Sequence, residues 1–298
     1  MQSKARLTDT LQGGGAGCGW PNKVHGRRMA FTVVTYNVLA TSYIKPHWYP
    51  FTPSEILNPQ HRIPAVAEHL ARLHADILCL QEVEDPMFVA IMRRLSLLGY
   101  VGEFTQKGLG RPDGCATFIQ TSSFKVTRVT SLIYHDGDGD RPASGHVAQV
   151  LALRAGEGLL GLCNTHLKWD PPQTPKEKQF GYRQIVQLLN ERTLLTPPCT
   201  AWVICGDFNT TVDGRVIEAL WEAGFQFSHV SSPGPTCNSN RRAKMIDYLF
   251  HDGALRAKPL PLPQVTDNTP LPGSEQPSDH VAVLAEFEWN YPHPGQRG

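Results

Sequence analysis

Apolar residues are concentrated in eight short runs that are separated by polar, Gly- and Pro-containing segments. The runs are rich in Val, Ile, Leu and Phe, which is typical of strands. Several of them are apolar throughout, as strands buried on both faces are. The predicted strands are 31–39, 77–80, 116–120, 147–154, 159–164, 202–205, 245–250 and 281–287.

Four other segments carry apolar residues three and four positions apart, as the buried face of a helix does. We expect Pro64 in the first turn of the first helix and Gly99 just after the second. The predicted helices are 63–74, 87–98, about 177–195 and 216–222. Helices alternate with strands in the first half, whereas later strands follow one another through loops. This order predicts an α/β fold with mixed sheets and helices outside.

Composition narrows the class of protein. Of 298 residues, 41% are apolar and 18% charged, which is typical of a globular protein that buries a sizeable core. Basic and acidic residues number 28 and 27, which argues against a protein that coats duplex DNA electrostatically. No apolar stretch is long enough to span a bilayer, so we expect no membrane partner.

The ends of the chain differ from its middle. Residues 1–29 are Gly-rich and contain five basic residues and one acid, so we predict a flexible tail, with organelle targeting as the alternative. We predict a single catalytic domain over 30–290 and a second tail over 291–298. Seven cysteines without metal-site spacing indicate a reducing compartment, and we expect a cytoplasmic location.

Polar residues capable of chemistry stand at the ends of the apolar runs. Taken singly, each is most simply a turn cap or a solvated side chain. Together they predict an oxygen-rich pocket that holds a hard divalent cation and the phosphate bound to it. The set consists of Asn37, Glu82, His166, Asp207, Asn209, Asp247, Asp279 and His280.

Hydrolysis of a phosphate ester suits this set. Glu82 is the best carboxylate for the cation, with Asn37 as a neutral oxygen ligand or an outer neighbour. Asp207 and Asn209 suit a base and an orienting amide for the attacking water. A histidine paired with a carboxylate can stabilise the phosphate charge, which suits His280 with Asp247. His166 offers a second phosphate contact.

Six segments, in this order, resemble the endonuclease/exonuclease/phosphatase family and span residues 31–289. The resemblance implies a four-layer, DNase I-like α/β sandwich, in which two packed mixed β-sheets are flanked by helices. It also implies Mg²⁺, for which Mn²⁺ can substitute, with Asp279 completing the metal and phosphate site. The segments are Tyr36-Asn37-Val38-Leu39-Ala40, Leu80-Gln81-Glu82-Val83-Glu84, Asn164-Thr165-His166-Leu167, Gly206-Asp207-Phe208-Asn209, Ile246-Asp247-Tyr248 and Ser278-Asp279-His280.

Other motifs resemble the deadenylase-type branch, which includes Ccr4-like poly(A) exonucleases, nocturnin, the Angel proteins and a 2′-phosphodiesterase. They include Asp113 in Asp-Gly-Cys-Ala, and Trp169 and Pro171 after the histidine. The resemblance implies that Pro171 lies against a substrate base, and we group Trp169, Asp113 and Arg242 with it as substrate-binding. The segment 240–244 departs from the branch, because arginines and a lysine stand where poly(A) exonucleases carry an aromatic residue.

Two activities therefore stay open. The first is a Mg²⁺-dependent phosphodiesterase that removes nucleotides from the 3′ end of RNA or oligonucleotides. The second is a phosphatase acting on a nucleotide or an RNA end with the same residues. We expect a monomer whose partner is single-stranded RNA, an oligonucleotide or a nucleotide. A binding module without catalysis is disfavoured, because Glu82, Asp207 and His280 are all present.

Overall fold

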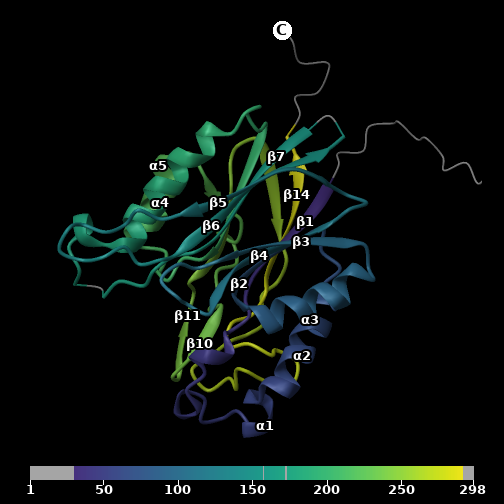
Figure 1. The fold of residues 1–298 in the computed structure, drawn as a ribbon, viewed down its shortest axis with the longest axis vertical. Coiled ribbons are helices and arrows are strands. Elements are labelled where there is room, and N and C mark those ends of the chain that lie inside the picture. Colours follow the sequence, from purple (N-terminus) through teal and green to yellow (C-terminus); the bar gives the residue numbers. More distant parts are fainter. Residues whose placement is uncertain (1–29, 157, 172, 291–298) are drawn as a thin grey trace, which may run out of the picture.

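Two six-stranded mixed sheets pack face to face, and helices cover their outer faces (Figure 1). This computed structural model describes residues 30–156, 158–171 and 173–290. The tails predicted over 1–29 and 291–298 lie outside the described residues. The four-layer α/β sandwich expected from the sequence is confirmed.

The first sheet contains both the first and the last strand of the fold. Strands β1 and β2 run parallel, and the other neighbours pair antiparallel. Its strand order is β13 (Leu255–Pro259), β14 (Val283–Trp289), β1 (Ala30–Asn37), β2 (Ile77–Glu84), β4 (Asp113–Gln120) and β3 (Tyr100–Gln106).

The second sheet repeats this plan, with β7 and β8 as its parallel pair. A separate hairpin, β10 (Cys237–Ser239) with β11 (Arg242–Lys244), lies at the end of the sandwich near α1 (Figure 1). The strand order of the second sheet is β5 (Lys125–Ile133), β6 (Val147–Ala155), β7 (Gly158–His166), β8 (Ala201–Asp207), β12 (Asp247–His251) and β9 (Gln226–Phe227).

Helices α2 (Pro59–Arg72) and α3 (Asp85–Ser96) cover the first sheet, and α4 (Phe180–Glu191) and α5 (Arg215–Glu222) cover the second. Successive side chains of a strand point to opposite faces. Accordingly Val34 packs under α2 and α3, whereas Val33 lies between the sheets. The shorter helices are α1 (Ser54–Leu57), η1 (Thr41–Tyr43), η2 (Pro46–Trp48), η3 (Lys176–Lys178) and η4 (Arg192–Leu194).

Helix α2 connects β1 to β2, and α4 connects β7 to β8. A crossover of this kind makes the two strands parallel, so that both end at the same edge of the sheet. The two parallel pairs therefore bring four strand ends together where the sheets meet. Within the described residues, no helix has the length and apolar character to cross a bilayer.

Several boundaries differ from the sequence prediction. Helix α2 begins at Pro59, because the Asn58 side chain accepts a hydrogen bond from the Gln60 amide as an N-cap; Pro64 lies inside the helix and not in its first turn. The helix predicted over 177–195 is divided into η3, α4 and η4. Strands β3, β5, β9, β10, β11 and β13 were not predicted.

Candidate active site

The ends of β1, β2 and β8 meet at one buried amide. The Asn37 Nδ2 group donates to Glu82 Oε1 at 3.1 Å and to Asp207 Oδ2 at 3.0 Å. Its Oδ1 atom accepts from the Leu39 amide at 2.9 Å. Asn37 thus presents its NH₂ group to the two carboxylates.

Glu82 reaches the site through a local break in its strand. The pairing of β2 with β4 shifts register between Leu80 and Val83, and Glu82 adopts a φ of 57°. A bulge of this kind re-aims one side chain, and the left-handed backbone of a non-glycine residue costs about 1–3 kcal/mol. The Ala40 amide holds Oε2 at 2.9 Å. Burial raises the pKa of the Glu82 carboxyl, although nearby Lys107 opposes this shift.

Asp207 ends β8 immediately after Gly206, whose φ is 149°. A Cβ atom there would lie 1.8 Å from the Thr165 carbonyl oxygen, so only glycine allows β8 to lie this close to β7. The Asn209 amide fixes Asp207 Oδ1 at 2.9 Å. Burial, and then the neighbouring Asp247 carboxylate, raise the pKa of Asp207 to about 7, and His280 lowers it in part.

His280 and Asp247 form a buried pair. His280 Nδ1 lies 2.8 Å from Asp247 Oδ2, which also accepts from the Thr236 hydroxyl at 2.6 Å. His280 Nε2 faces Asp207 Oδ2 at 3.8 Å. Burial lowers the pKa of His280, but the Asp247 carboxylate outweighs this effect and holds it well above its ordinary value. The raised pKa favours a protonated ring, whose Nε2–H then faces the other carboxylate.

His166 has the opposite character. Its Nε2 atom lies 3.0 Å from Asn209 Nδ2, and its Nδ1 atom 3.2 Å from Lys107 Nζ. Burial, and then the positive charge of Lys107, keep the pKa of His166 well below its ordinary value. A neutral imidazole retains an acceptor nitrogen, whereas an imidazolium does not. The two histidines of the site thus differ in charge.

Four supporting residues were not predicted from the sequence. Lys107 donates to Asp113 Oδ2 at 2.7 Å, and the Tyr43 hydroxyl donates to Asp113 Oδ1 at 2.7 Å. The Tyr49 hydroxyl donates to Asp279 Oδ2 at 3.0 Å. Arg62 is buried under the loop that follows β1. The available signals were weak, because Lys107 follows the edge strand β3, which has little apolar pattern, and the two tyrosines lie in the segment between β1 and α1.

A cleft of about 260 Å³ opens above these side chains, and Arg242 is among the residues that line it. Trp169 and Pro171 are not among its lining residues. Asp113 is also not among them, because it is fully buried in its ion pair with Lys107. Lining residues are Leu39, Tyr43, Trp48, Tyr49, Glu82, Asp207, Asn209, Cys237, Ser239, Arg242, Lys244, Ile246, Asp279 and His280.

The donor set fits a hard divalent cation. Asp207, Asp247 and His280 lie close together, with one atom of each within 4.8 Å of the others. A protonated His280 has no lone pair for a metal ion, so the carboxylate oxygens are the candidate ligands. Within the described residues, Asp247 Oδ1 is buried without a hydrogen-bond partner, and burial raises the pKa of both Glu82 and Asp207. Carboxylates crowded in this way gain from a cation, and oxygen ligands are those that Mg²⁺ prefers. Asp247 is bound to His280 and does not line the cleft. The carboxylates that line it are Glu82, Asp207 and Asp279.

Comparisons with known proteins agree with this geometry. The family model described as "Endonuclease/Exonuclease/phosphatase family" matches residues 34–280. The chain is similar to the 2′,5′-phosphodiesterase 12 of Bos taurus, with 25% identity over 86% of this chain and 51% of the relative. It thus spans about half the length of that relative.

A second relative is the CCR4-Not complex 3′-5′-exoribonuclease subunit Ccr4 of Candida glabrata, with 26% identity over 88% of this chain and 37% of the relative. Among solved structures, ANGEL2, described as a 2′,3′-cyclic phosphatase, has a TM-score of 0.74 and 22% identity over 89% of this chain and 97% of the other. The human Nocturnin catalytic domain has a TM-score of 0.68 and 24% identity over 88% and 96%. At these identities the two structures establish the fold.

Proposed function

Because the chain belongs to the endonuclease/exonuclease/phosphatase family, we propose that it is a metal-dependent phosphodiesterase that removes nucleotides from the 3′ end of RNA or oligonucleotides. One observation carries the proposal: three carboxylates and an imidazolium converge on a cleft large enough for part of a nucleotide strand. The names of the two relatives, a 2′,5′-phosphodiesterase and a 3′-5′-exoribonuclease, support the same substrate class.

We assign the metal to Glu82 and Asp279, with Asp207 beside them and Asn37 orienting Glu82 and Asp207 from behind. We propose Mg²⁺ as the cation, for which Mn²⁺ can substitute. When bound, it neutralises charge on the phosphate and lowers the pKa of coordinated water. Removal of divalent ions with a chelator is expected to abolish turnover, and Mg²⁺ to restore it.

The attacking water is assigned to Asp207 and Asn209. Asp207 is held by the Asn37 side chain and the Asn209 amide, and its pKa of about 7 suits a base that takes a proton near neutral pH. The water proton passes to this carboxylate as the water oxygen bonds to phosphorus. The bond from phosphorus to the leaving ribose oxygen breaks, and that oxygen takes up a proton from solvent. The products are a nucleoside 5′-monophosphate and a shortened strand with a free ribose hydroxyl at its end.

His280 is assigned to the phosphate oxygen on which negative charge develops. Its Nδ1–H is bound by Asp247, so its Nε2–H is directed into the cleft with the positive charge that Asp247 maintains. His166 has a different role. It contacts the Asn209 side-chain amide and holds it beside the attacking water, and it offers a second contact to phosphate.

We also propose that the protein acts as a cytoplasmic monomer on single-stranded RNA, oligonucleotides or nucleotides. The six described cysteines are free thiols, which suits a reducing compartment. Multi-angle light scattering during size-exclusion chromatography measures the mass of the particle. A mass of one chain, about 33.0 kDa, is expected for the full sequence.

The test is a product assay with Mg²⁺ on a 3′-poly(A) RNA, a 2′-5′ oligoadenylate and a nucleoside monophosphate. Stepwise release of nucleoside 5′-monophosphate from either oligonucleotide is expected. Glu82→Ala and Asp207→Ala should each lower kcat by about 10³-fold, because each removes charge at the reacting phosphate. Glu55→Ala, an exposed carboxylate on α1, is the matched control.

Circular dichroism confirms that the variants are folded before their rates are compared. Release of inorganic phosphate from the nucleoside monophosphate, without cleavage of either oligonucleotide, would replace the proposal by the phosphatase alternative. Undiminished turnover by folded Asp207→Ala protein would reject the assigned mechanism.

A further inference from the structure

One face of the β10–β11 hairpin forms a wall of the cleft. Ser239 pairs with Arg242 and Cys237 with Lys244. Side chains two positions apart on a strand share a face, and all four of these residues line the cleft. The wall is therefore built from two small side chains on β10 and two cations on β11.

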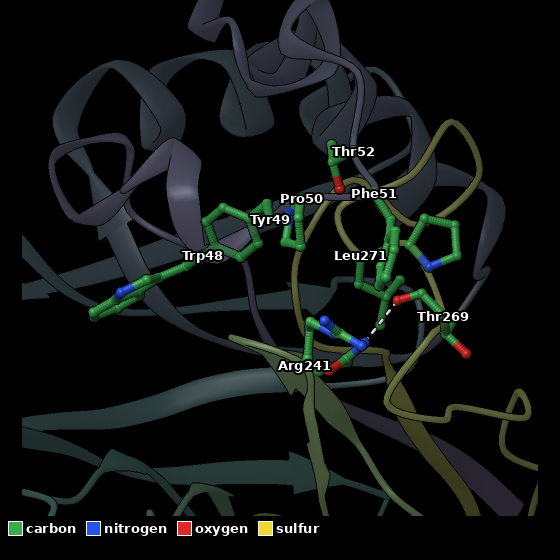
Figure 2. Close-up of a pocket in the computed structure, with 10 residues that line it drawn as sticks. Trp48, Tyr49, Pro50, Phe51, Thr52, Arg241, Thr269 and Leu271 are labelled. Carbon is green, nitrogen blue, oxygen red and sulfur yellow. Dashed lines mark hydrogen bonds between the residues drawn. The ribbon is translucent and has the colours of Figure 1, made fainter.

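The hairpin is fixed from behind. On its other face, Asn238 Nδ2 donates to the Thr269 carbonyl at 2.7 Å. At its tip, the Arg241 guanidinium lies 5.4 Å from the ring centre of Phe51. Figure 2 shows Arg241 extending from the hairpin toward Phe51 and Leu271, away from the strands of the sandwich. The wall is thus held in place by the loops around it.

The hairpin is also joined to the catalytic centre. Cys237 forms a β-bridge with His280, and the Asn238 amide donates to the Asp279 carbonyl at 2.8 Å. The cations of β11 are therefore held on the same backbone unit as the imidazolium assigned to the scissile phosphate.

Arg242 and Lys244 have free charges. Both are exposed, and among the described residues no carboxylate forms an ion pair with either, although the floor of the cleft carries Glu82, Asp207 and Asp279. Two unpaired cations on the rim of a phosphate site create a local positive potential. Their position favours an anion that binds beside the scissile phosphate and not on it.

We propose that Arg242 and Lys244 bind a second phosphate, the one directly 5′ of the scissile phosphate. The proposal rests on the proposed function and specifies its substrate. A 3′-terminal nucleotide that ends in hydroxyls has no further phosphate on its 3′ side, so the neighbouring phosphate of such a strand lies 5′. The preferred substrate is an oligonucleotide, or a dinucleotide with a 5′-phosphate, and a dinucleoside monophosphate is a poor one.

Four substrates that share their two 3′-terminal bases and the type of scissile bond test whether a second phosphate is recognised. They are a dinucleoside monophosphate, the same dinucleotide with a 5′-phosphate, a trinucleotide, and a trinucleotide whose 5′ linkage is a neutral methylphosphonate. For the unaltered protein with Mg²⁺, kcat/KM should be about tenfold or more higher when the second phosphate is charged. The 5′-phosphorylated dinucleotide and the charged trinucleotide distinguish a terminal phosphate from a backbone phosphate as its source.

The variant Arg242→Ala/Lys244→Ala is expected to lose this discrimination, so that the charged and neutral trinucleotides react equally. Its log KM should also depend less steeply on log salt concentration, with a slope lower by about 0.7, the value for one phosphate on a single strand. Arg256→Ala/Lys258→Ala is the matched control, because these residues are an exposed Arg and Lys two positions apart on β13 and do not line the cleft.

The outcomes separate the two proposals. Equal kcat/KM for the charged and neutral trinucleotides in the unaltered protein would overturn the second-phosphate site while leaving the phosphodiesterase function in place. If Arg242→Ala/Lys244→Ala keeps its thermal stability and still prefers the charged trinucleotide, the second-phosphate site would also be overturned. Failure to cleave any of the four substrates would instead reject the proposed function.

Discussion

Lys107 and Asp113 form a buried ion pair next to the catalytic groups. The Lys107 ammonium lies 2.7 Å from Asp113 Oδ2 and 3.2 Å from His166 Nδ1. A buried pair of this kind contributes less to stability than its short distance implies, because both ions lose their hydration. Its role here is to orient the ring of His166, which in turn contacts the Asn209 side-chain amide.

Removing one ion of this pair should therefore destabilise the fold more than removing both. Lys107→Met leaves the Asp113 carboxylate buried without its cation, and we expect the free energy of unfolding to fall by about 3–5 kcal/mol. Lys107→Met/Asp113→Asn should be more stable than the single variant, whereas kcat stays low in both because His166 is no longer held. Urea denaturation and steady-state kinetics measure the two effects.

The control is an ion pair on the surface. Arg94 contacts Glu68 at 2.7 Å with both side chains partly exposed, so Arg94→Met should cost less than about 1 kcal/mol. A double variant no more stable than Lys107→Met would contradict the idea that the two buried charges act as a pair.

Among the elements, helix α2 supports the cleft through one buried side chain. Arg62 donates to the Val38 carbonyl at 2.7 Å and to the Thr41 hydroxyl at 3.1 Å. Between these two contacts lie the Leu39 amide, which holds Asn37, and the Ala40 amide, which holds Glu82. The helix thus positions residues of the site by fixing the turn after β1.

Arg62→Met should lower stability by about 1–3 kcal/mol, because it leaves a buried carbonyl without its donor. It should also weaken Mg²⁺ binding, since the turn that holds Glu82 is loosened. Isothermal titration with Mg²⁺ and urea denaturation separate these effects. Arg62→Lys should recover part of both, and Arg72→Met, on the exposed side of α2, should change neither. Unchanged Mg²⁺ affinity in Arg62→Met would show that the turn is held by other contacts.

The elements found from the sequence and those missed differ in position. The eight predicted strands became β1, β2, β4, β6, β7, β8, β12 and β14, which all lie inside the two sheets. Of the six missed strands, β3, β13, β5 and β9 are the four edges of the two large sheets, and β10 and β11 form the separate hairpin. An edge strand is solvated along one side and carries polar residues, so its apolar pattern is weak. In β5, for example, Leu132 alone is buried.

At the scale of the whole molecule, burial opposes the protonation of several histidines. It lowers the pKa of His69, His229 and His251, and it lowers that of His146 to about 2. In the unfolded chain these groups titrate near their ordinary value of 6.5. The folded state therefore binds fewer protons than the unfolded state below that pH, and the free energy of unfolding falls as the pH falls. His280, Glu82 and Asp207, whose pKa values are raised in the folded state, contribute in the opposite direction.

Stability should thus decrease from pH 7 toward pH 5, with each buried neutral histidine contributing up to about 1.4 kcal/mol per pH unit below 6.5. Urea denaturation at several pH values, without divalent ions, measures the slope. His146→Gln should make the slope shallower by about the share of one group. His74→Asn, at an exposed position, should leave it unchanged. A slope that is the same in His146→Gln would mean that this ring does not resist protonation.

The sequence by itself determined the fold class, the family and the strand-end residues of the site, because long apolar runs and motifs of adjacent residues are local properties. Only the tertiary structure decided which groups meet. Lys107 lies next to His166 although 59 positions separate them, and Asp113, grouped with the substrate-binding residues from the sequence, is the buried partner of Lys107. The pKa shifts were decided in the same way: burial and then Lys107 lower the pKa of His166, whereas Asp247 raises that of His280 against the effect of burial. A single sequence does not state which distant residues become neighbours, so protonation and pairing follow from packing.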